Sequence, residues 1–124
     1  MNKILILGFH TINLTLIIFY LYPGSLLGFV LYNDSFIQPQ ITKDFLISSN
    51  HFYSFIILSF VGIVTYNKSN KINLLIKYLF LLSVFLEFFH LIIPNRSFEL
   101  SDLFGNILGV FFVIIIYKIK NKYA

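Results

Sequence analysis

The sequence predicts an all-α integral membrane protein, built as a bundle of four transmembrane helices. Of its 124 residues, 58% are hydrophobic and only 11% are charged, whereas a soluble domain is about half apolar and a quarter charged. A small domain leaves a large share of its surface exposed, so this chain cannot hide its apolar content from water. These observations argue against a soluble enzyme, a nucleic-acid binder and a disordered tail.

The first predicted span covers residues 4–22, preceded by Lys3 and ended by Pro23. Its apolar stretch is longer than a signal-peptide core and no small-x-small cleavage site follows, so we expect an uncleaved span. Residues 23–50 form the longest connection. Within it, residues 26–32 are apolar but too short to cross a bilayer, which predicts a segment in the membrane interface.

Three further spans are predicted over residues 51–66, 74–93 and 102–117. Pro94 is expected to end the third span, because proline removes a backbone donor and clashes with the preceding helical turn. We find no internal repeat and no soluble segment. Residues 1–124 are therefore expected to form a single membrane domain.

The distribution of positive residues predicts the orientation, because loops on the cytoplasmic side carry an excess of Lys and Arg. With the N-terminus inside, the outer side holds only Lys43 and Arg96. The inner side holds Lys3, Lys68, Lys71, Lys77, Lys118, Lys120 and Lys122. We therefore expect a multi-pass membrane protein with both termini in the cytoplasm. Because these lysines adjoin apolar segments, no nucleic-acid partner is expected.

Arg96 is the only arginine in a chain that otherwise uses lysine for its cations. The guanidinium group forms planar, bidentate contacts with carboxylates or phosphates that lysine cannot copy. A lone arginine in a short outer loop therefore indicates a chemical role at that position.

Polar residues gather toward the outer ends of the last three spans. Glu87 lies inside the third span, where a charged side chain is costly, and His90 follows three residues later on the same helix face. Asp102 and Asn106 share one face of the fourth span. We expect these ligand-binding candidates to converge near the outer membrane surface: His51, Glu87, His90, Arg96, Asp102 and Asn106.

Each candidate also has a plainer interpretation. His51 can be an interfacial residue, and Glu87 a protonated or paired structural carboxyl. Asp102 stands where an acidic residue stabilises a helix start. Gly105 and Gly109, four residues apart, are expected to allow close helix packing.

The spacing Glu87-x-x-His90 also occurs in di-iron bundles, which need two copies and further glutamates. This chain has one copy. With His51 and Asp102 a single-metal site stays open as an alternative, but we predict no metal and no cofactor.

Two sequence motifs resemble a known family. EFFHLIIPNR over residues 87–96 and DLFGNILG over residues 102–109 are similar to the VanZ-like family of small bacterial membrane proteins, whose hallmark is Glu-x-x-Gln, Pro-x-Arg and then Asp-x-x-x-Asn-x-x-Gly. His51 before a Phe-rich span matches an earlier element of the family. The resemblance covers about half of the chain. Two departures are His90 at the usual Gln and Ser49-Asn50 at the usual Asp-Lys.

The resemblance implies an envelope protein of the bacterial inner (plasma) membrane with polar residues near the outer face. The leading hypothesis is binding of an anionic envelope ligand or a glycopeptide-like compound, with Arg96 as the bidentate contact, Asp102 and Asn106 orienting it, and Glu87 and His90 setting the local charge. The chain is thus not assigned as an enzyme or a non-enzyme.

Two alternatives stay open. One is an intramembrane acid–base enzyme that acts on a lipid or cell-wall precursor, with Glu87 or His90 as general base. The other is a structural subunit of an oligomer or membrane partner, fixed by an internal ion-pair network of Arg96, Glu87 and Asp102. In each case the lipid bilayer is the expected surrounding.

Overall fold

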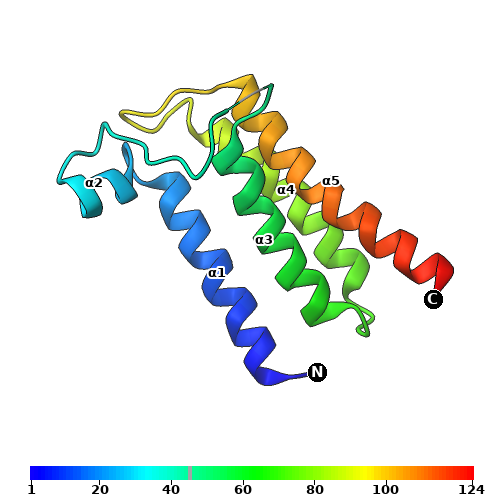
Figure 1. The fold of residues 1–124 in the computed structure, drawn as a ribbon. Helices are drawn as coiled ribbons and strands as arrows, with labels where there is room; N and C mark the ends of the chain where they lie inside the picture. The colour runs from blue at the N-terminus through cyan, green and yellow to red at the C-terminus, as the bar shows by residue number, and fades with distance from the viewer. Residues whose placement is uncertain (45) are drawn as a thin grey trace.

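The computed structural model describes residues 1–44 and 46–124, and these residues contain five helices and no strand. The helices are α1 (Lys3–Leu21), α2 (Leu26–Tyr32), α3 (Ser49–Tyr66), α4 (Ile72–Phe89) and α5 (Leu100–Tyr123). The four long helices form one bundle in which α3 contacts α1, α4 and α5 (Figure 1). The prediction of an all-α protein is confirmed.

The prediction of four transmembrane helices is corrected to three candidate spans. By length and composition, α1, α4 and α5 are suited to cross a membrane, and α3 does not qualify. The reason is polarity: α3 starts with Ser-Asn-His over residues 49–51 and carries Ser54 and Ser59 on its way through the bundle. Its neighbours α1, α4 and α5 shield it, so it needs less apolar surface than a helix that faces lipid.

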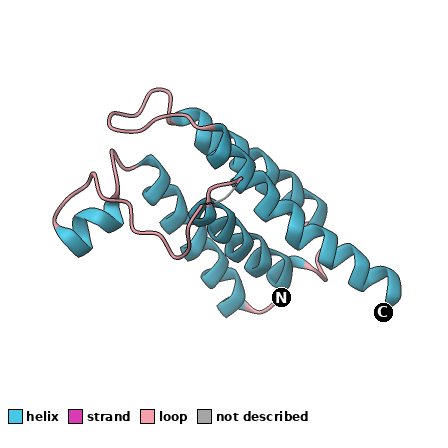
Figure 2. Ribbon diagram, turned by 45° about the horizontal axis from the view of Figure 1, so that its top comes forward, coloured by secondary structure: helices cyan, strands magenta, loops and turns pink. Residues whose placement is uncertain are grey.

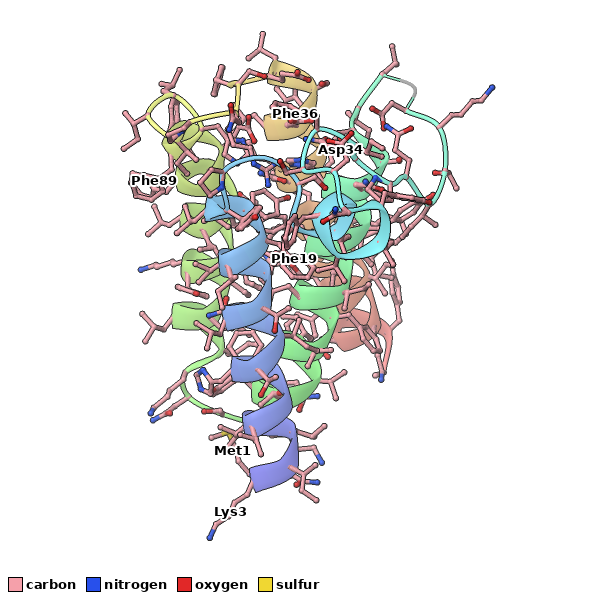
Figure 3. All side chains as sticks on the ribbon, turned by 90° about the vertical axis from the view of Figure 1, so that its left-hand side faces the viewer. Met1, Lys3, Phe19, Asp34, Phe36 and Phe89 are labelled. Carbon is pink, nitrogen blue, oxygen red and sulfur yellow. The ribbon has the colours of Figure 1, made fainter. Side chains whose placement is uncertain are left out.

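Both chain ends lie at one end of the bundle, and residues 22–44, 46–48 and 90–99 lie at the opposite end (Figure 1). Figure 3 shows the same separation, with Met1 and Lys3 at one end and Asp34, Phe36 and Phe89 at the other. We call this second end the loop end. The assignment of the loop end to the outer side of the membrane stays a prediction.

The helix α4 ends at Phe89, four residues earlier than expected. The N–H groups of His90, Leu91 and Ile92 bond to carbonyls three residues back, which tightens the chain into turns after the helix. Pro94 therefore sets only an outer limit for this helix. The chain then continues around Asn95, which has a left-handed φ of 60°.

The short helix α2 lies beside the loop end of α1 (Figures 2 and 3). The hydroxyl of Ser25 accepts the N–H of Gly28 and caps its start, and Asn33 ends it with a left-handed φ of 53°. With seven residues it is too short to span a bilayer. Its exposed side chains include Val30 and Leu31, and its place in the membrane interface stays a prediction.

Two glycines let α5 lie directly against α3. A Cβ atom at Gly105 would come within 2.8 Å of the carbonyl oxygen of Ser48, and one at Gly109 within 2.7 Å of that of Phe52. Both approaches are shorter than a real Cβ contact allows, so only glycine fits. Asn106, on the same turn of α5, is thereby carried into the buried interior next to α3.

Candidate polar ligand site

The loop end of the bundle contains a cluster of polar side chains that come from all four long helices. It comprises Tyr20, His51, Glu87, His90, Asp102 and Asn106, with Arg96 at its edge. All of these residues except Tyr20 were predicted from the sequence to meet here. The predicted residues other than Arg96 are in direct contact within the cluster. Arg96 lines the same pocket as His51, His90 and Asp102.

A triangle of hydrogen bonds forms the centre of the cluster. The hydroxyl of Tyr20 donates to Oδ1 of Asn106 at 2.6 Å. Nδ1 of His51 lies 3.0 Å from both that hydroxyl oxygen and Oδ1 of Asn106. The amide nitrogen of Asn106 donates to the carbonyl oxygen of Ser83 at 3.0 Å, which fixes the orientation of the amide and turns its oxygen toward Tyr20 and His51.

This triangle determines which nitrogen of His51 carries the proton. The Tyr20 hydroxyl has one hydrogen and gives it to Asn106, and the amide oxygen of Asn106 only accepts. Nδ1 of His51 must therefore be the donor in its two contacts. In the neutral imidazole this leaves Nε2 with a free lone pair, and Nε2 lies 3.6 Å from Oδ2 of Asp102.

Glu87 and His90 form a second, fully buried pair, exposed by 0% and 2%. Nε2 of His90 lies 2.9 Å from the carbonyl oxygen of Tyr20 and so donates to it. In the neutral imidazole Nδ1 of His90 is then an acceptor, and it faces Oε2 of Glu87 at 3.2 Å. Within the described part of the chain, neither of these two facing atoms has a hydrogen-bond partner.

The other carboxylate oxygen of Glu87 is anchored. Oε1 accepts the backbone N–H of Glu99 at 3.0 Å, so the loop before α5 holds the carboxylate in place. A buried polar atom without a partner costs about 1–3 kcal/mol. Oε2 of Glu87 is therefore held and buried without a hydrogen bond, and it faces Nδ1 of His90 at 3.2 Å and Nδ1 of His51 at 3.9 Å.

Arg96 caps the end of α1. Its Nε donates to the carbonyl oxygen of Tyr22 at 3.1 Å and its Nη2 to that of Phe19 at 2.6 Å. These carbonyls belong to the last turn of α1 and its C-cap, where backbone acceptors lack helical partners. Burial lowers the pKa of Arg96, while Glu87 and Asp102 act to raise it, and the guanidinium stays charged.

Arg96 does not form the ion pairs with Glu87 and Asp102 that one hypothesis from the sequence proposed. Among the residues that the structure describes, no carboxylate oxygen lies within 4.0 Å of its guanidinium nitrogens. One edge of the group is used for backbone carbonyls, which leaves Nη1 for a ligand. The polar network inside the bundle is thus made of hydrogen bonds and histidine contacts, without an ion pair to Arg96 in the described residues.

Three hollows meet at this cluster. A polar pocket of about 130 Å³ includes His51, Arg96, Glu99 and Asp102 in its walls. It shares His51 and Arg96 with a second pocket of about 100 Å³ among α1, α2 and α3. The second pocket shares Phe19, Tyr20 and Ser54 with a mostly apolar groove of about 240 Å³ between α1 and α3.

Tyr20 is the main site residue that the sequence did not reveal. A tyrosine at the end of an apolar span is typical of the aromatic belt at a membrane surface. Here its side chain is 7% exposed, and its ring stacks on that of His90 at 5.8 Å between centroids. Its position at the same end of the bundle as His51 was the available signal.

Comparison with known families gave one match. The family model described as VanZ/LLP1 matches residues 6–121, which confirms the resemblance and extends it from about half of the chain to nearly all of it. No curated protein and no solved structure matches the chain.

Proposed function

The chain belongs to the VanZ/LLP1 family, and we propose that it binds an envelope lipid or lipid-linked cell-wall precursor with an anionic head at its loop end. The family and the three apolar helices place it among membrane proteins. The observation that carries the proposal is the continuity of the three hollows. An amphipathic ligand needs a polar pocket for its head group that connects to an apolar groove for its hydrocarbon chain.

The polar pocket offers donors for a head group. Arg96 retains its Nη1 donors, and the amide side chains of Gln38 and Asn50 line both the polar and the second pocket. A volume of about 130 Å³ is several times the roughly 30 Å³ share of a water molecule in the liquid. A phosphate-sized group therefore fits there.

Carboxylates in the same pocket limit where a negative head can lie. The carboxylate of Asp44 already binds Ser49, because Oδ1 of Asp44 accepts the N–H of Ser49 at 2.9 Å and the hydroxyl of Ser49 at 3.1 Å. Glu99 and Asp102 lie on the α5 side. The head is therefore expected on the side of Arg96, next to the opening that leads to the second pocket.

The groove supplies the place for a hydrocarbon chain. It runs between α1 and α3 and is lined by Ile12, Leu16 and Ile57 together with threonines. Because α1 qualifies as a membrane span, this groove opens toward lipid when the helix is in a bilayer. An acyl or isoprenyl chain gains apolar contact there without leaving the membrane.

Ser54 gives the sharpest test, because it lines both the second pocket and the groove. We expect Ser54→Leu to block this junction and to weaken binding of a fluorescent phospholipid or polyprenyl phosphate by at least roughly tenfold, about 1.4 kcal/mol. Ser54→Ala is the matched control, since it removes the hydroxyl and leaves the junction open. Equal binding by the leucine variant and the wild type would refute the proposal.

A second candidate function is acid–base catalysis on the same ligand. Glu87 is fully buried, and His90 lines the pocket but is only 2% exposed and has its Nε2 bonded to the carbonyl oxygen of Tyr20. His51 also lines the pocket, and its Nε2 lone pair is free. His51 is therefore the better placed base. Mass spectrometry of a lipid phosphate incubated with pure protein tests this: conversion that stops in His51→Gln supports catalysis, and an unchanged lipid excludes it.

A further inference from the structure

We infer that His51, Glu87 and Asp102 form a binding site for one divalent first-row metal ion, beyond the lipid binding proposed above. Each residue comes from a different helix, α3, α4 and α5. One potential ligand atom from each lies within 4.8 Å of those of the other two. The sequence left a single-metal site with His51 and Asp102 open as an alternative, but it predicted no metal because the Glu-x-x-His motif is single.

The spacing of His51 and Asp102 suits a shared ion. Nε2 of His51 and Oδ2 of Asp102 are 3.6 Å apart, which is too long for a good hydrogen bond. Two ligands of one tetrahedral zinc ion, each about 2.1 Å from the metal, lie about 3.4 Å apart. The pair is therefore close to the separation that joint coordination requires.

Glu87 supplies an independent indication. Its Oε2 is buried and has no hydrogen-bond partner among residues 1–44 and 46–124. The same carboxylate is anchored through Oε1 by the N–H of Glu99. A buried carboxylate that is held by one oxygen, and whose other oxygen accepts no hydrogen bond, is arranged to act as a ligand for a cation.

Asn106 orients His51 as a supporting residue does in metal sites. A metal-bound histidine usually donates its other ring N–H to an oxygen acceptor, which fixes the tautomer and the ring position. Here Nδ1 of His51 donates to Oδ1 of Asn106, and Ser83 fixes the amide in turn. The lone pair of Nε2 is thereby directed to the side of Asp102.

The donor set indicates the kind of ion. One imidazole nitrogen and two carboxylates balance the charge of a divalent ion, and the chain has no cysteine to offer a soft ligand. Imidazole favours Zn²⁺ over Mg²⁺, while carboxylates accept either. Three protein ligands leave a coordination position open, and His51 and Asp102 line the polar pocket.

A proton is the competing occupant. Oε2 of Glu87 faces Nδ1 of His90 at 3.2 Å, and one proton between them would satisfy both atoms without a metal. That proton would not involve Asp102, whose Oδ2 lies 3.6 Å from Nε2 of His51. A bound ion would instead engage all three residues, and Nε2 of His51 would then act as a ligand and not as a base.

Metal binding is tested on the full-length protein in detergent, stripped with a chelator and with no lipid added, so that the result does not depend on the proposed lipid function. We expect equilibrium dialysis to find one Zn²⁺ per chain, bound far more tightly than Mg²⁺. Asp102→Asn, which keeps the shape but removes the charged ligand, should weaken Zn²⁺ binding at least roughly tenfold. The control Glu99→Gln changes a carboxylate of the same pocket outside the triad and should bind as the wild type does.

A second measurement avoids variants. Co²⁺ added to the wild-type protein should give visible absorption of a nitrogen- and oxygen-coordinated ion, which Zn²⁺ abolishes at one equivalent. Absence of saturable binding of either ion would overturn the inference and leave the proton as occupant. Equal Zn²⁺ affinity in wild type and Asp102→Asn would also overturn it, and binding lost in both Asp102→Asn and Glu99→Gln would point to a general surface effect.

Discussion

The amide of Asn106 connects the carbonyl oxygen of Ser83 to the imidazole of His51: its nitrogen donates to the first at 3.0 Å and its oxygen lies 3.0 Å from Nδ1 of the second. This one side chain, 0% exposed, joins α3, α4 and α5 and also accepts the hydroxyl of Tyr20 from α1. It therefore holds the bundle together at the site and sets the tautomer of His51.

Replacing Asn106 by leucine should lower the thermal stability of the protein in detergent strongly. The change keeps the side-chain size but leaves Ser83, Tyr20 and His51 without their partner, and each stranded polar group costs about 1–3 kcal/mol. The control is Asn13→Leu, because Asn13 accepts a single hydrogen bond from Tyr78 in a less buried position. A shift in melting temperature no larger than that of the control would contradict this role.

Replacing Tyr20 by phenylalanine removes one hydroxyl and keeps the ring that stacks on His90. Oδ1 of Asn106 then retains the N–H of His51. The free energy of unfolding should therefore fall by the contribution of one hydrogen bond, about 1 kcal/mol. Chemical denaturation of the two proteins side by side measures it. Tyr117→Phe is the control, since the Tyr117 hydroxyl bonds to no described residue, and a Tyr20 variant as stable as this control would argue against the bond.

A methyl group at Gly109 should separate α5 from α3. The added Cβ would lie 2.7 Å from the carbonyl oxygen of Phe52, and such overpacking costs typically about 1–3 kcal/mol. Gly8→Ala is the matched control, because a Cβ at Gly8 meets nothing within 4 Å and alanine favours a helix by about 0.5–1 kcal/mol. We expect melting temperatures to move in opposite directions; a shared direction would show that the close approach is not limiting.

Replacing Arg96 by lysine should loosen the link between the 90–99 connection and α1. One ammonium group cannot reproduce the two divergent donors that reach Phe19 and Tyr22, and hydrogen bonds from charged groups contribute about 1.5–3 kcal/mol. Hydrogen–deuterium exchange should rise around residues 18–22 and 96–100 and stay unchanged at the Lys71 end of α4. Unchanged exchange at the end of α1 would mean that the cap is dispensable.

The sequence predicted the positions of the long helices well, because apolar runs with polar or proline boundaries are local signals. It predicted four spans, but three helices qualify as candidate spans by length and composition. The fourth, α3, differs from a lipid-facing helix because its start is polar, and this polar start contributes to the site. The end of α4 was misplaced because Pro94 forbids continuation but does not forbid an earlier turn.

The candidate site was predictable where its members share a helix face. Glu87 with His90, and Asp102 with Asn106, follow from spacings of three and four residues. The partners of Tyr20 and Arg96 did not follow from the sequence. Those of Tyr20 lie 31 and 86 positions away along the chain, and those of Arg96 lie 74 and 77 positions away. Those of Arg96 are backbone carbonyls, which every residue carries and which leave no trace in a sequence.

The Arg96 cap has a consequence for the order in which the protein assembles in its membrane. α1 is synthesised first, yet the groups that complete its loop end, Arg96 for its carbonyls and Asn106 for its tyrosine, are among the last third of the chain to be made. During synthesis the carbonyl oxygens at this end of α1 therefore lack these hydrogen-bond partners, and the site is complete only after α5 has been made.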